Sequence, residues 1–117
     1  IISYADITSW FSGSNAEYAT TPDTNGVGFY VGNKSSPTSA IIYKNGAPIA
    51  TNAISNTAIL STAMVTVHAL NVSGSGVLYN TSRTLSYYGF GYSVTVNLAK
   101  PYYDAVQNVQ IALGRQK

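Results

Sequence analysis

The chain has 117 residues, enough for one domain of ordinary size and too few for two. Charged residues make up only 9% of it, and its six Lys and Arg residues, which leave a net charge of +2, are scattered, so a nucleic-acid partner is not expected. The lack of cysteine excludes disulfides and thiolate chemistry, and the lack of any run of about 18 apolar residues argues against membrane insertion.

The first part of the chain predicts strands joined by turns. Residues 1–11 (IISYADITSWF) alternate imperfectly and are rich in β-branched and aromatic types, which favours a strand over a helix. Residues 12–26 are rich in turn formers, and a short strand is expected from Val27 to Val31. Because the chain opens on Ile1 rather than Met, we expect it to be a fragment or the ordered part of something longer, with processing as the alternative.

The clearest local signal is a β-hairpin in residues 39–52 (SAIIYKNGAPIATN). Two β-rich runs flank Asn45-Gly46, a pair that readily adopts the positive φ angles of a type I′ turn. Pro48 lacks a backbone N–H and so removes one ladder donor. The second strand of the hairpin is therefore expected at a sheet edge, or to begin near Pro48.

Three further strands are expected in the second half of the chain. Residues 63–71 (AMVTVHALN) alternate, and neither side is very polar, which predicts a strand covered on both faces. A short strand is expected at 77–79. Residues 83–95 (RTLSYYGFGYSVT) are read as an aromatic strand, in which Gly89 and Gly91 mark a bulge or a close backbone approach.

The end of the chain changes period and predicts an amphipathic helix over residues 101–113. Apolar side chains recur at i, i+4, i+7 and i+11, namely at Tyr102, Val106, Val109 and Leu113. Pro101 suits the first helical position, and Gly114 suits the exit. We expect this stripe to be buried on the sheet.

The order of these features resembles a known family. The stretches GVGFYVGNKSSPTSAIIYKNGAPI, VTVHALNVSGSGVLYNTSRTLSYYGFGYSV and YYDAVQNVQIALGRQ resemble the C-terminal part of concanavalin A-like (laminin-G-like) jelly-roll domains, of the kind found in phage and bacterial surface proteins. The resemblance implies an all-β jelly-roll sandwich with a short C-terminal α-helix, formed by residues 1–117 as a single domain. Such domains are usually longer, so the resemblance also implies that the chain is the C-terminal portion of a longer polypeptide and that the opening strands are missing.

The distribution of catalytic residue types argues against an enzyme. Glycosidases on this fold need two carboxylates that flank the scissile bond, whereas Asp6, Glu17, Asp23 and Asp104 are scattered along the chain. His68 is the only histidine and lies in an apolar strand, so we interpret it as a core residue rather than a base. No G-x-S-x-G elbow positions a serine nucleophile.

No cofactor is expected, with calcium as the minor alternative. Asp23 and Asn25, in the segment TPDTNG, offer oxygen ligands of the kind that hard cations prefer, and laminin-G-like domains often carry calcium on a rim loop. The favoured reading is an Asx-type turn that reverses the chain.

The aromatic residues suggest a binding surface. Ten Tyr and one Trp exceed what one small core should need, and a Tyr ring suits both sugar rings and protein interfaces. The candidate glycan contacts are Trp10, Asn71, Arg83, Tyr87 and Tyr92, and ordinary core packing or solvated loop positions are the alternatives. We therefore expect a non-enzymatic module on a virion surface or outside a bacterial cell, which binds a glycan or cell-surface polysaccharide. The alternative is a structural subunit of a fibre, spike or decoration that contacts other structural subunits, most simply as a homo-oligomer.

Overall fold

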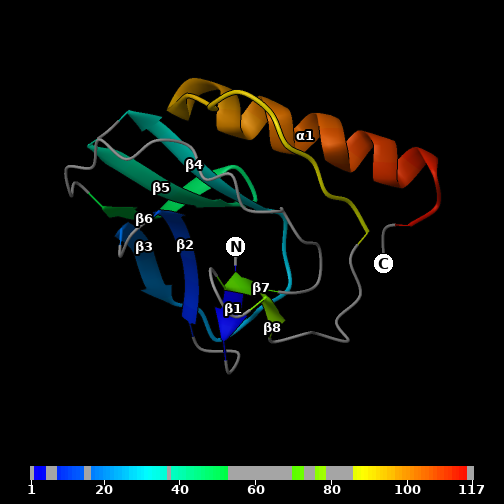
Figure 1. Cartoon of the computed structure of the whole chain (residues 1–117). Helices are drawn as coiled ribbons and strands as arrows, with labels where there is room; N and C mark the ends of the chain where they lie inside the picture. The colour runs from blue at the N-terminus through cyan, green and yellow to red at the C-terminus, as the bar shows by residue number, and fades with distance from the viewer. Residues whose placement is uncertain are drawn as a thin grey trace. The chain divides into compact units, whose positions relative to one another are not determined.

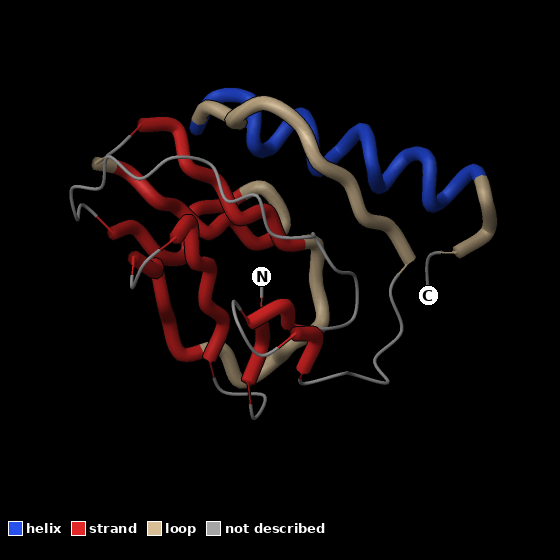
Figure 2. Tube along the Cα trace, in the orientation of Figure 1, coloured by secondary structure: helices blue, strands red, loops and turns tan. Residues whose placement is uncertain are grey.

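A computed structural model describes residues 2–4, 8–14, 17–36, 38–52, 70–72, 76–78 and 86–115 (Figure 1). The contacts between residues in space divide the chain into two compact units. One is formed by residues 1–58 together with 91–117, and the other by residues 59–90. The described residues are mostly strands, followed by one C-terminal helix (Figure 2). The elements are β1 (Ile2–Tyr4), β2 (Thr8–Ser14), β3 (Glu17–Pro22), β4 (Tyr30–Ser36), β5 (Ser39–Lys44), β6 (Ala47–Asn52), β7 (Leu70–Val72), β8 (Gly76–Leu78) and α1 (Val96–Ala112).

The first unit opens with an antiparallel sheet in the order β1-β2-β3. A strand was expected within residues 1–11, and β1 and the first part of β2 lie there. The prediction of a turn over residues 12–26 is wrong for β3, which pairs with β2 from Thr8 opposite Pro22 to Ser14 opposite Glu17. The neighbouring strand gives the backbone of this polar segment its hydrogen-bond partners, and Ala19 is buried in the core, so tertiary pairing overrides local turn propensity.

The second sheet of this unit has the order β4-β5-β6 and contains the predicted hairpin. Asn45 and Gly46 both have positive φ, 53° and 82°, as a type I′ turn requires, so the hairpin is confirmed. Pro48 is the second residue of β6, an edge strand of this sheet, in agreement with the expectation. Beside it the register shifts, because Tyr43 lies opposite Pro48 while Ile42 lies opposite Ala50.

Strand β4 begins later than predicted, at Tyr30 instead of Val27. The two backbone N–H groups at Val27 and Phe29 donate to the side-chain oxygens of Asn25 and Asn45, at 3.1 and 2.9 Å. Gly28, between them, has a φ of 154°. Because side chains take these donors, the ladder with β5 starts only at Tyr30, which lies opposite Lys44.

The core lies where β3 meets β5. Ala19, Ala40 and Ile42 are buried together, and Tyr30, Ile49 and Ala50 pack against them. Successive side chains of a strand point to opposite faces, so the buried ring of Tyr43 lies on the other face of β5. In Figure 1 α1 lies across β4–β6 on the side away from β2 and β3. Both faces of β5 are thus covered.

Helix α1 begins at Val96, five residues earlier than predicted, and Pro101 lies inside it. Pro lacks the N–H that would bond four residues back, which is why the sequence favoured a start at Pro101. The residues before it still form helical bonds, since the N–H groups of Leu98 and Ala99 both donate to the Thr95 carbonyl. Ala99 is buried, and this packing offsets the one missing bond.

The predicted buried stripe of the helix is only partly correct. The buried residues are Ala99, Val106 and Gln110, so Val106 is confirmed. Val109 and Leu113 are each 55% exposed, contrary to the prediction. Helix α1 contacts β6 of the described sheet, and Val109 and Leu113 stay uncovered.

In the second unit, β7 and β8 pair antiparallel from Leu70 opposite Leu78 to Val72 opposite Gly76. The short strand expected at 77–79 is confirmed for Val77 and Leu78, and most of the strand predicted at 63–71 lies outside the described residues. The aromatic strand predicted at 83–95 is wrong for its described part, since residues 86–95 form no ladder. Among the described residues, no helix is long and apolar enough to cross a membrane.

Candidate functional site

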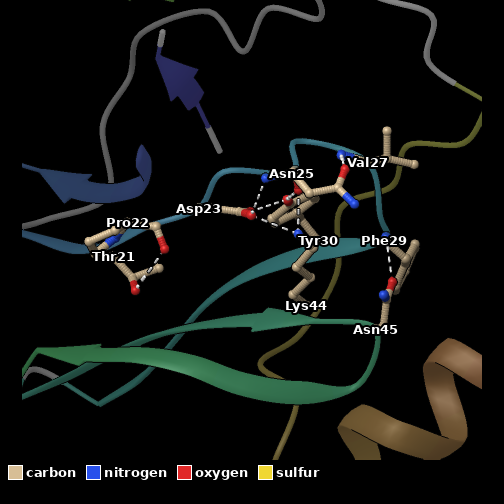
Figure 3. Close-up of polar contacts among 9 residues, drawn as sticks. All are labelled: Thr21, Pro22, Asp23, Asn25, Val27, Phe29, Tyr30, Lys44 and Asn45. Carbon is tan, nitrogen blue, oxygen red and sulfur yellow. Dashed lines mark hydrogen bonds and ion pairs between the residues drawn. The ribbon is translucent and has the colours of Figure 1, made fainter. Parts of the chain in front are cut away.

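The densest polar cluster among the described residues is centred on Asp23, just after β3 (Figure 3). Asp23 Oδ1 accepts a bond from the Asn25 backbone N–H at 3.2 Å, which closes an Asx turn. The Tyr30 hydroxyl donates to Asp23 Oδ2. Two elements, the loop and β4, therefore meet at one carboxylate.

Lys44, at the end of β5, supplies the cationic partner. Its Nζ lies 2.8 Å from Asp23 Oδ1 and also donates to the Asn25 carbonyl. The ammonium lies 5.2 Å from the centre of the Tyr30 ring, within cation–π range. The side chains of Lys44 and Asp23 are only 18% and 9% exposed, so this ion pair is shielded from water. We call Asp23, Tyr30 and Lys44 the latch, and residues 23–29 the Asp23 loop.

The latch shifts the pKa of each of its members. Bonds from Lys44 and Tyr30 lower the pKa of Asp23 from 3.8 to about 2. Burial, together with the bond to Asp23, raises the pKa of Tyr30, and the bond to Asp23 raises the pKa of Lys44. A carboxylate with so low a pKa is a weak base at neutral pH, so the latch is suited to holding the chain together rather than to acid–base catalysis.

The geometry favours the Asx-turn interpretation of Asp23 and Asn25 over the calcium alternative. Asp23 Oδ1 and the Asn25 carbonyl, the oxygens that a cation would use, both accept bonds from the Lys44 ammonium. Asn25 Oδ1 accepts the Val27 N–H. Within the described part of the chain, no group of three His, Cys, Asp or Glu residues is arranged to hold a metal ion.

The five candidate glycan contacts fall in different parts of the chain. Trp10 lies in β2, opposite Thr20, and Asn71 lies in β7, opposite Val77; Arg83 lies outside the described residues. Tyr87 and Tyr92 are both exposed, and Tyr92 is fully so. Because Tyr87 belongs to the unit of residues 59–90 and Tyr92 to the other unit, each is described separately.

A pair of exposed aromatic rings accompanies Tyr87 in the unit of residues 59–90. Tyr88 and Phe90 are 63% and 74% exposed, and their ring centres lie 6.3 Å apart at an interplanar angle of 59°. A Cβ added at Gly89 would lie 3.0 Å from the Tyr87 hydroxyl oxygen, so the lack of a side chain at Gly89 leaves room for that ring. We call Tyr88 and Phe90 the aromatic pair.

Sequence reasoning missed two members of the latch, Tyr30 and Lys44. The available signal was the pairing of β4 with β5: these two residues lie directly opposite each other, where cross-strand side chains interact. It also missed the aromatic pair as a feature of its own. The Phe90 ring is exposed, and residues 86–95 lie outside any sheet ladder.

Comparisons with models of known protein families, with curated proteins and with solved structures find no match to this chain.

Proposed function

We propose that the chain is a non-enzymatic surface module, a glycan-binding or adhesive domain of a phage virion appendage or of a bacterial extracellular protein. We further propose that the strands of this chain belong to a jelly-roll sandwich, as the sequence resemblance implies. The observation that carries the proposal is the exposed aromatic pair. Aromatic rings held open to solvent offer apolar faces on which the C–H faces of a sugar ring can pack.

The composition supports the same proposal. Only 9% of the residues are charged, so hydroxyl and amide groups supply most of the surface polarity, and such groups form hydrogen bonds with sugar hydroxyls. Trp10, Asn71, Arg83, Tyr87 and Tyr92 remain the other proposed glycan contacts. The polar latch has no part in this proposal, because its groups bond to one another.

A glycan array tests this proposal. We expect the chain to bind a defined set of glycans, and we expect Tyr88→Ala with Phe90→Ala to weaken binding by at least about tenfold, since stacking on an aromatic ring contributes about 1 kcal/mol or more. Val27→Ala is the matched control, because it removes another strongly exposed apolar side chain on the Asp23 loop. Retained binding in the double variant, or no binding by the unaltered chain, would contradict the proposal.

A second candidate function is a structural subunit that assembles with copies of itself. It is favoured by apolar side chains exposed along α1, among them Leu98, Val109 and Ile111. Native mass measurement separates the two candidates. A stable oligomer that Leu98→Glu with Val109→Glu converts to monomer, in a chain without glycan binding, supports assembly, whereas a monomer with glycan binding supports the first proposal.

A further inference from the structure

We infer that the β5–β6 turn couples the Asp23 loop to helix α1, so that the latch controls how firmly the helix is held on the sheet. The coupling lies entirely within the unit formed by residues 1–58 and 91–117. It is built from three successive contacts, which join the latch to the loop, the loop to the turn and both of these to the helix.

The first contact is the latch itself, which fixes the start of the Asp23 loop to the end of β5. Lys44 Nζ is bonded both to the Asp23 carboxylate and to the Asn25 carbonyl. Lys44 is also the last residue before the β5–β6 turn. The loop is therefore held by the strand that leads directly into the turn.

The second contact joins the far end of the loop to the turn. The Phe29 N–H donates to Asn45 Oδ1 at 2.9 Å (Figure 3). The Asn45 N–H in turn donates to the Phe29 carbonyl at 2.8 Å. These two bonds fix the backbone of Phe29 on both sides. The loop is thus attached to neighbouring residues of the chain, Lys44 at one end and Asn45 at the other.

The third contact joins loop and turn to the helix. The Phe29 ring lies edge-on to Tyr102, with ring centres 5.5 Å apart, and 6.1 Å from the ring of Tyr103. On the turn, a Cβ at Gly46 would lie 2.7 Å from the Lys100 Cα, so the helix backbone rests directly on this glycine. Phe29 and Gly46 therefore both contact the first half of α1.

It follows that the Asp23 carboxylate acts on the helix through the loop and the turn. Loss of the latch frees the start of the loop, Phe29 is then positioned less firmly, and its aromatic contacts with Tyr102 and Tyr103 weaken. The Gly46 contact remains. The helix should consequently open more often from the sheet while β5 and β6 stay paired.

Amide hydrogen exchange on the full chain tests this coupling. In Asp23→Asn we expect hydrogen exchange to accelerate about tenfold for the backbone amides between Ala99 and Val106 that lie on the buried side of the helix. The exchange rate of the Ile42 amide, in the core of β5, should change little. The control is Asp104→Asn, which breaks the exposed ion pair with Lys100 on the helix itself. Although Asp104 lies in α1, its replacement should accelerate hydrogen exchange of the same amides by less than about threefold.

The alternative outcomes overturn the inference. Faster exchange at Val27 and Phe29 with an unchanged helix would mean that loop and helix open independently. Equal acceleration at Ile42 and in the helix would mean that Asp23 stabilises only the whole fold. Tyr30→Phe provides a milder test if Asp23→Asn does not fold, because it keeps the ring and removes one bond to the carboxylate; the helix should respond in the same direction.

Discussion

At the scale of single residues, the described structure depends on hydrogen bonds and ion pairs between polar side chains, and their strength depends on how far water reaches them. Asp23 accepts from a backbone N–H, a hydroxyl and an ammonium, and the shielded position of the pair strengthens these bonds relative to bonds in open solvent. The pair of Lys100 and Asp104 offers a contrast. Their side chains are 61% and 49% exposed, so water screens this attraction.

The low pKa of Asp23 predicts a loss of stability in acid. Its pKa is about 2 in the folded chain and 3.8 as the ordinary value, so the unfolded chain binds the proton more tightly. The stabilisation is therefore fully present above about pH 4 and is lost as the pH falls through about 2. Urea unfolding at about pH 5 and about pH 2 should show the unaltered chain losing about 1 kcal/mol more than Asp23→Asn, after allowance for solvent screening.

The control for the acid experiment is Asp104→Asn, whose carboxylate is exposed. Because water screens the ion pair of Asp104 with Lys100, this variant should differ only slightly from the unaltered chain at either pH. If Asp23→Asn also follows the unaltered chain, Asp23 makes no contribution to the acid sensitivity and its contacts in the folded chain are weaker than the structure indicates.

At the scale of elements, a two-residue turn decides how the helix and the sheet meet. Gly46 serves two purposes: its φ of 82° completes the hairpin turn, and its lack of a side chain lets the helix backbone approach. The helix in turn tolerates Pro101 within its second turn, since Ala99 is buried where the helix rests on this glycine.

The two roles of Gly46 can be separated by comparing it with Gly114. Gly46→Ala adds a methyl group 2.7 Å from the Lys100 Cα and also strains the positive φ. Gly114→Ala, at a φ of 66° with nothing within 4 Å of the new Cβ, adds only the strain. We expect costs of about 2 kcal/mol or more and about 1 kcal/mol respectively, measured by urea unfolding followed by circular dichroism. Equal costs would mean that the close approach of the helix contributes nothing.

At the scale of the whole molecule, low charge is the dominant property. With a net charge of +2 and an isoelectric point near 8.9, the chain has little electrostatic repulsion between copies. Apolar and aromatic side chains are exposed at the same time, on α1 and in residues 87–92. Short-range attraction between copies is therefore opposed only weakly.

This balance predicts that self-association increases between pH 7 and pH 9. Light scattering should show more attractive interaction as the pH approaches the isoelectric point, because the residual positive charge disappears. Arg115→Glu changes the net charge at pH 7 by two, from +2 to 0, and should move the maximum of association toward pH 7. A maximum that stays near pH 9 in this variant would show that net charge is not the controlling property.

The sequence by itself determined the features that depend on near neighbours in the chain. Asn45-Gly46 specified the hairpin because few other residue pairs reach its positive φ angles so readily, and the change of period specified that the chain ends in a helix. Tertiary structure decided the rest. Pairing with β2 made a strand of Glu17–Pro22, side-chain oxygens delayed the start of β4 to Tyr30, and packing of Ala99 moved the helix start ahead of Pro101. The partner of Asp23 lies 21 positions away at Lys44. Such a contact depends on the register between β4 and β5, which is fixed only when the strands pair.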